Sequence, residues 1–133
     1  MTDISLSAVP ITVTDVDAAL GFYRDALGLA VVGDVPAGDH RWVSLALGTG
    51  PTIVLSDPGA GRSVDDGRAL AELVTKGTGP GPYILATDDL DGAFSRARDA
   101  GADVVQEPAD QPWGPRDCAF RDPSGNLIRI QAL

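Results

Sequence analysis

The sequence predicts an α+β fold in which two βαβββ modules form a curved mixed sheet around a cleft. Two observations predict it: an internal repeat, and the same order of strand-like and helix-like segments in each copy. A helix-like segment around Asp17 resembles one around Asp91, and at the same separation of 74 residues Arg24 is matched by Arg98. A repeat at a fixed spacing indicates a duplicated structural unit.

In the first copy, an extended segment over residues 9–14 leads into a helix. Thr14 or Asp15 supplies the N-cap oxygen of this helix, and Gly28 ends it. Its apolar residues recur every three to four positions, as on a helix packed against a sheet: Ala19, Leu20, Phe22, Tyr23 and Leu27. The strands expected after this helix span residues 29–35, 41–47 and 52–56.

The second copy repeats this order. A strand over residues 82–87 precedes a helix over 90–100, and three further strands are expected over 103–106, 117–121 and 127–131. Between the copies lies a linker bounded by Gly and Pro, residues 57–80, with a short amphipathic helix over 64–75. We therefore expect one domain over residues 1–133, with module one over 1–56 and module two over 81–133.

Composition excludes several classes of protein. The chain has 10 Lys and Arg against 19 Asp and Glu, a formal net charge of −9, which argues against nucleic acid and anionic membrane surfaces as partners. One cysteine, Cys118, excludes an internal disulfide, and one histidine, His40, excludes any site that needs two imidazoles from one chain. No targeting or membrane-spanning segment is recognisable, so we expect a cytoplasmic protein.

Two segments carry a resemblance to a known family. Residues 13–28, which read Val-Thr-Asp-Val-Asp-Ala-Ala-Leu-Gly-Phe-Tyr-Arg-Asp-Ala-Leu-Gly, resemble the first-module signature of the vicinal oxygen chelate superfamily. Residues 120–128, with Asp-Pro-Ser-Gly-Asn at their centre, resemble its closing hairpin. That superfamily includes glyoxalase I, extradiol dioxygenases, bleomycin-resistance proteins and fosfomycin-resistance enzymes, so the resemblance implies its fold but leaves the function open.

The resemblance also implies where a metal centre would lie. Metal-using members carry His or Glu on the first and last strands of each module, and these positions fall on Ala8, Pro82, Arg129, and Val54 or Leu55. None of these side chains offers a lone pair suited to a divalent ion, and Arg129 repels a cation. We therefore expect no metal, no cofactor and no catalytic residue of the usual kind.

Aromatic and basic side chains are the candidates for lining a ligand cleft. We interpret seven residues in this way: His40, Trp42, Tyr83, Trp113, Arg116, Phe120 and Arg129. Bleomycin-resistance proteins use aromatic side chains to sandwich planar ligands. Packing in the core is the alternative for the aromatic residues, and a polar turn is the alternative for His40.

Strand periodicity places Arg129 on one face with Leu127 and Gln131. On that face its guanidinium could pair with an internal carboxylate, Glu107 or Asp117, or with a carboxylate or phosphate of a ligand. Cys118 is interpreted as a small buried hydrophobic residue and not as a nucleophile.

Together these observations favour a metal-independent protein that sequesters a small organic molecule, and the resemblance implies that it works as a homodimer. The negative net charge favours a cationic ligand, and Arg129 makes a zwitterion easier to accommodate. The alternative is a lyase or isomerase of the glyoxalase type, or an oxygenase of the extradiol dioxygenase type. Without a metal, its only acid/base candidates would be His40, Glu107 and Asp117. An inert interaction module is a third possibility.

Overall fold

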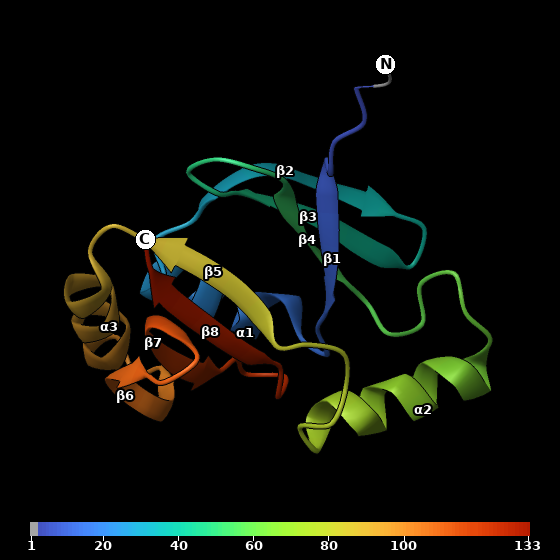
Figure 1. The fold of residues 1–133 in the computed structure, drawn as a ribbon. Helices are drawn as coiled ribbons and strands as arrows, with labels where there is room; N and C mark the ends of the chain where they lie inside the picture. The colour runs from blue at the N-terminus through green and yellow to red at the C-terminus, as the bar shows by residue number, and fades with distance from the viewer. Residues whose placement is uncertain (1–2) are drawn as a thin grey trace.

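A computed structural model describes residues 3–133 and confirms the α+β fold of two βαβββ modules (Figure 1). The strands of module one form sheet A, in the order β1-β4-β3-β2, and those of module two form sheet B, in the order β5-β8-β7-β6. Sheet A consists of β1 (Ala8–Thr12), β2 (Ala30–Ala37), β3 (His40–Ala46) and β4 (Thr52–Ser56). Sheet B consists of β5 (Tyr83–Thr87), β6 (Asp103–Gln111), β7 (Gly114–Arg121) and β8 (Leu127–Ala132).

The helices also repeat between the modules. In module one, α1 (Val16–Leu20) continues as a π-helical turn, η1 (Gly21–Ala26), and in module two the matching helix is α3 (Leu90–Asp99). Asp15 caps α1 by accepting from the Ala18 amide, and Asp89 caps α3 by accepting from the Gly92 amide. The linker helix α2 (Val64–Thr75) has the predicted bounds.

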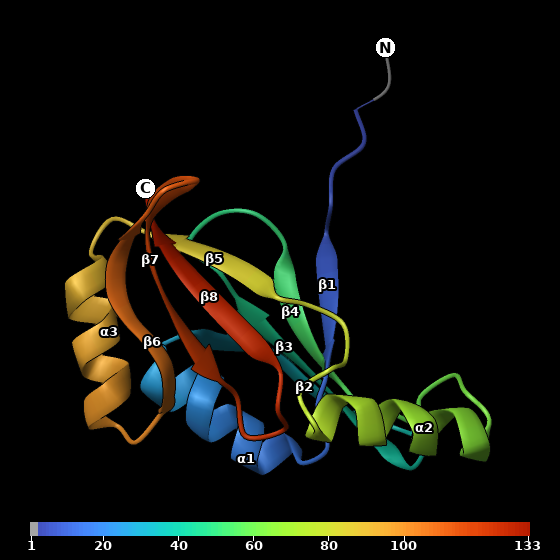
Figure 2. The same ribbon diagram turned by 60° about the horizontal axis from the view of Figure 1, so that its bottom comes forward.

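One hydrophobic core joins the two modules. Sheet A contributes Ile11, Val43, Leu45, Ile53 and Leu55 to it, and sheet B contributes Cys118, Phe120, Ile128 and Ile130. Phe22 of η1 lies 6.2 Å from Phe120, ring centroid to ring centroid, and Phe94 of α3 stacks on the same ring at 5.5 Å. Both views accordingly place α1 beside strands of sheet B as well as sheet A (Figures 1 and 2).

Because both helix-covered faces belong to this core, the opposite face of each sheet points away from it. We call these the open face of sheet A and the open face of sheet B. The strands form two four-stranded mixed sheets, one in each module, as the βαβββ pattern predicts.

A hydrogen-bonded latch fixes module one to the turn between β7 and β8. The Tyr23 hydroxyl donates to Asp122 at 2.6 Å, the Asn126 side-chain amide donates to the Thr12 carbonyl at 2.8 Å, and the Thr14 amide donates to the Ser124 hydroxyl at 2.9 Å. All three bonds connect residues about a hundred positions apart, so the latch holds the two modules in one arrangement.

An arginine in each sheet reaches back to the helix of its own module. Arg41 of β3 pairs with Asp17 of α1 at 2.8 Å, and Arg116 of β7 pairs with Asp91 of α3 at 2.9 Å. Asp17 and Asp91 are the residues that the repeat matches. Among residues 3–133, no helix has the length and apolar character needed to cross a membrane.

Candidate functional site

The open face of sheet A carries an exposed aromatic side chain. Val43 and Leu45 of β3 are fully buried on the core side, so Trp42 and Ser44 point the other way. Trp42 is paired in register with Val35 of β2, and the two are 46% and 54% exposed. Two large apolar side chains therefore lie side by side on this face, where a planar molecule can pack against them.

The open face of sheet B carries a polar cluster centred on Asp117. One carboxylate oxygen, Oδ1, accepts hydrogen bonds from the side-chain amides of Gln106 at 3.0 Å and Gln111 at 2.8 Å. The other oxygen, Oδ2, accepts from Nη1 of Arg129 at 3.0 Å, and the same Nη1 donates to Gln106 at 3.1 Å. We call these four residues the Asp117 cluster.

The charge state of this cluster follows from its contacts. Burial raises the pKa of Asp117, but the hydrogen bonds from Gln111, Gln106 and Arg129 outweigh it, and the net pKa lies below the usual value. Asp117 therefore stays ionised at neutral pH and balances the charge of Arg129. Of the two internal partners considered for Arg129, the structure selects Asp117, while Glu107 is exposed.

His40 and Trp113 lie at the margins of the open faces. His40 begins β3, and its Nδ1 lies 3.5 Å from the Asp57 carboxylate in the loop after β4. Trp113 occupies the tip of the β6–β7 hairpin, is 74% exposed and follows the register pair of Gln111 with Gly114. Neither residue belongs to the hydrophobic core, and their contact with a ligand stays a prediction.

Two of the aromatic candidates face the core and not a cleft. Phe120 is fully buried, is paired in register with the core residue Ile128 and stacks on Phe94. Tyr83 packs against the core from β5, and its neighbour Ile84 takes the open face at 59% exposure. Strand alternation turns both rings of Phe120 and Tyr83 toward the helix-covered core, so neither belongs to the open face of sheet B.

Arg116 likewise lies on the core side of its strand. It shares the side of β7 occupied by Cys118, and its guanidinium binds Asp91 on α3. This contact lies on the helix-covered side of module two, so Arg116 does not belong to the open face of sheet B. Cys118 is fully buried, and burial followed by the nearby charge of Asp117 raises the pKa of its thiol to about 11, as suits a packing residue.

The positions that hold metal ligands in metal-using relatives do not fit a metal here. Val54 alternates with the core residues Ile53 and Leu55, and Ala8 is paired in register with Thr52, so both lie on the side of sheet A opposite to the core, where Ala8 is exposed and Val54 is buried. Arg129 lies on the open face of sheet B. Among residues 3–133, no three His, Cys, Asp or Glu side chains gather closely enough to hold a metal ion. Methyl, isopropyl and guanidinium groups cannot replace oxygen or imidazole ligands.

The acid/base candidates for a metal-free enzyme are likewise not brought together. His40 belongs to sheet A, and Asp117 belongs to sheet B on the other side of the shared core. Asp117 already accepts three side-chain hydrogen bonds, and Glu107 points to solvent. Within the chain, these three groups do not face one substrate.

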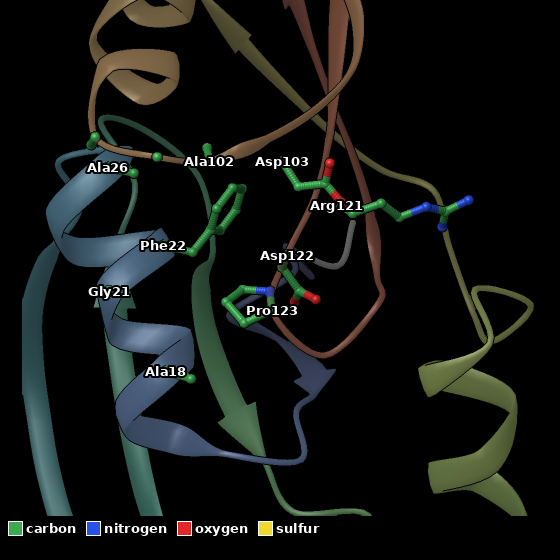
Figure 3. A pocket seen from close by; sticks show the side chains of 11 residues that line it. Ala18, Gly21, Phe22, Ala26, Ala102, Asp103, Arg121, Asp122 and Pro123 are labelled. Carbon is green, nitrogen blue, oxygen red and sulfur yellow. The ribbon is translucent and has the colours of Figure 1, made fainter.

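A groove of about 420 Å³ lies between η1 and the turn after β7, and sequence reasoning missed it (Figure 3). Its helix side consists of small residues and the ring of Phe22, and Asp122 and Pro123 lie opposite. Asp122 accepts five hydrogen bonds, from the Tyr23 hydroxyl, the Asn126 side chain and the amides of Ser124, Gly125 and Asn126. Its carboxylate is thus committed to the turn and the latch.

The fold and the open faces define a small two-module protein of the vicinal oxygen chelate type. Residues 5–130 match the model of the Glyoxalase/Bleomycin resistance protein/Dioxygenase superfamily, and the chain belongs to this family. An uncharacterized protein of Mycobacterium bovis is 33% identical over 117 residues, which cover 87% of this chain and 75% of the relative.

Solved structures of similar proteins agree with this assignment. UcmS2 superposes with a TM-score of 0.86 at 30% identity, covering 98% of both chains. TnmS3, described as an antibiotic binding protein from Streptomyces sp. CB03234, superposes with a TM-score of 0.75 at 26% identity, covering 99% of this chain and 98% of TnmS3. The family thus includes proteins that bind small molecules as well as enzymes.

Proposed function

We propose that this chain binds a small organic molecule without a metal ion, holding it against the open faces in a sequestration or resistance role. The observation that carries the proposal is the chemistry of the positions where metal-using relatives have their ligands. These positions hold the exposed methyl group of Ala8, the buried side chain of Val54 and the partly exposed guanidinium of Arg129. Such a surface suits an organic molecule and not a divalent ion.

The exposed side chains of the open faces support an aromatic ligand. Trp42 and Val35 offer a flat apolar wall on sheet A, and Ile84 offers apolar surface beside Arg129 on sheet B. Side chains of this size are normally covered in a monomer, and contiguous exposed apolar surface marks binding sites. The likeness to TnmS3, described as an antibiotic binding protein, supports a small organic ligand.

We also propose that two copies complete the cleft, with the open face of sheet A of one copy against the open face of sheet B of the other. Because the two open faces of one chain point away from their shared core, one chain supplies two half-sites and no closed cleft. The segment ahead of β1 extends away from the body, with Ile4 86% and Leu6 66% exposed, and suits contact with a second chain (Figure 1).

Sedimentation equilibrium at micromolar concentration tests the second copy. A mass of two chains supports the proposal, and a mass of one chain that persists at tens of micromolar contradicts it. Replacing both Ile4 and Leu6 with Ser leaves the folded body untouched and is expected to weaken the dimer.

The net charge of −9 adds a preference among ligands. A strongly acidic protein raises the local concentration of cations and lowers that of anions, more so at low ionic strength. We therefore expect cationic, zwitterionic or neutral planar molecules to bind better than anions of the same shape.

Thermal shift and tryptophan fluorescence test binding directly with a library of planar and cationic natural products. A ligand at 100 times its Kd stabilises a protein by about 2.7 kcal/mol, a readily measured shift. We expect quenching to persist in Trp113→Leu and to be lost in Trp42→Leu, because Trp42 lies on the open face and Trp113 at a hairpin tip.

A titration with Ni²⁺, Zn²⁺, Fe²⁺ and Mn²⁺ tests the alternative of a metal-dependent enzyme. Stoichiometric binding of one of these ions, with turnover of a hemithioacetal or a catechol, would overturn the proposal in favour of a glyoxalase or dioxygenase. A library without a single thermal shift or quenching ligand would also end it.

A further inference from the structure

The Asp117 cluster leaves part of the Arg129 guanidinium unused. A guanidinium has five N–H donors, two on each Nη and one on Nε. Nη1 donates to Asp117 Oδ2 and to Gln106 Oε1, which occupies both of its hydrogens. Among residues 3–133, Nε and Nη2 have no acceptor within hydrogen-bond distance, and the side chain is 29% exposed. Up to three donors of this partly exposed side chain therefore remain without an acceptor among these residues.

The cluster holds this guanidinium in one place. Asp117 is only 6% exposed, and the amides of Gln106 and Gln111 fix its other oxygen. An arginine anchored along one edge keeps its plane and its remaining donors in a fixed direction. Preorganised donors of this kind are worth more to a ligand than those of a mobile side chain.

The surrounding charge decides which acceptor these donors suit. Asp117 carries a negative charge 3.0 Å from Nη1, so the pair is locally neutral. The whole chain adds a net charge of −9. A ligand carboxylate or phosphate would approach Asp117 and the acidic field unfavourably, whereas a neutral carbonyl oxygen accepts from the guanidinium without this repulsion.

We propose that Arg129 is a specificity-determining residue, and that its free edge donates to a neutral carbonyl oxygen on the ligand bound at the open face of sheet B. This inference rests on the proposed binding function and narrows its ligand class. Ile84 of β5, the register partner of Arg129, is 59% exposed and offers apolar surface for the carbon skeleton beside that oxygen. The favoured ligand is a planar hydrocarbon framework that carries a carbonyl group.

Three matched compounds test this inference by equilibrium dialysis: fluorene, 9-fluorenone and fluorene-9-carboxylate. They share one carbon skeleton and differ in having no acceptor, a neutral carbonyl acceptor, or an anionic acceptor. We expect 9-fluorenone to bind the unmodified protein about tenfold more tightly than fluorene, since a hydrogen bond to a charged donor is of that order.

In Arg129→Lys we expect this preference to fall to about twofold or less, with the affinity for fluorene little changed. Lysine keeps the positive charge beside Asp117 but loses the planar fork that serves two acceptors at once. The matched control is Arg41→Lys, the same substitution on the helix-covered side of sheet A, where Arg41 binds Asp17 and Asp34. The control is expected to keep the full carbonyl preference.

Each other outcome has a separate meaning. Equal binding of fluorene and 9-fluorenone would overturn the inference about Arg129 and leave the binding function standing. Tightest binding of the carboxylate would also overturn it, because the site would then select an anion. Absence of binding by all three compounds would overturn it together with the proposal of a planar ligand. A carbonyl preference that survives in Arg129→Lys would assign the recognition to another residue.

Discussion

Replacing Tyr23 with Phe removes one oxygen from the latch between the modules. Tyr23 is fully buried, and its hydroxyl donates to Asp122 at 2.6 Å. A hydrogen bond to a charged group contributes about 1.5–3 kcal/mol to stability. In this variant Asp122 Oδ2 still accepts a hydrogen bond from the Asn126 side chain at 2.8 Å, so this carboxylate oxygen keeps a hydrogen-bond partner. We therefore expect a loss of about 2 kcal/mol in the free energy of unfolding.

Urea denaturation followed by far-ultraviolet circular dichroism measures this loss, at one protein concentration for all variants. For a chain of this size the corresponding fall in Tm is roughly 6–10 °C. The control is Tyr83→Phe: Tyr83 is partly buried, and its hydroxyl has no hydrogen-bond partner among residues 3–133. This variant is expected to change the free energy of unfolding by less than about 0.5 kcal/mol.

Tyr23→Phe is also expected to change how the free energy of unfolding depends on pH in alkaline solution. Burial, followed by the charge of Asp122, raises the pKa of Tyr23 well above its usual value. Above about pH 10 the unfolded chain loses this proton while the folded chain keeps it, so stability falls as pH rises toward the folded pKa. Tyr23→Phe should flatten this alkaline fall. Equal stabilities of the Tyr23 and Tyr83 variants, with equal alkaline slopes, would refute the latch.

Two further predictions concern packing. Gly125 has a φ of 112°, and a β-carbon there would collide with the backbone carbonyl of Val74. Gly125→Ala should therefore lower the free energy of unfolding by more than about 2 kcal/mol, as measured by thermal or urea unfolding. The control Gly21→Ala should leave the free energy of unfolding unchanged, because the space around its β-carbon is open. Cys118 is fully buried, and the pKa of its thiol is raised to about 11. At pH 8 we therefore expect iodoacetamide to leave Cys118 unmodified in the folded protein and to alkylate it in urea, which mass spectrometry measures.

The repeat made most of the fold predictable. Matched residues at a spacing of 74 predicted two modules of one design, and the caps, helices and strand order of both follow it. The β6–β7 hairpin is longer than predicted: β6 runs to Gln111, beyond the expected end at residue 106, and β7 begins at Gly114, ahead of the expected start at residue 117. Irregularities in the ladder at Gln106 and Ala109 let this polar segment continue along β7.

The site was predictable where strand alternation was applied and was missed where it was not. Alternation along β8 put Arg129 on the face opposite to Ile128 and Ile130, and the structure has it there, paired with Asp117. Phe120 and Tyr83 were assigned by the region of chain in which they lie, although each alternates with a residue on the open face. Gln106 and Gln111 carry no sequence signal of their own, since their role depends on the register of β6 with β7.

The shared core has a consequence for how this molecule can respond to a ligand. Proteins that clamp a ligand between two lobes need lobes that separate at low cost. Here, separating the two modules would expose Phe22, Tyr23 and Phe120, which pack in the shared core. The free-energy cost of exposing each large apolar side chain to water is about 1.5–3 kcal/mol. The two halves therefore move as one body, and a ligand meets surfaces already in place. Affinity in such a protein is set by how well the ligand fits these preformed faces.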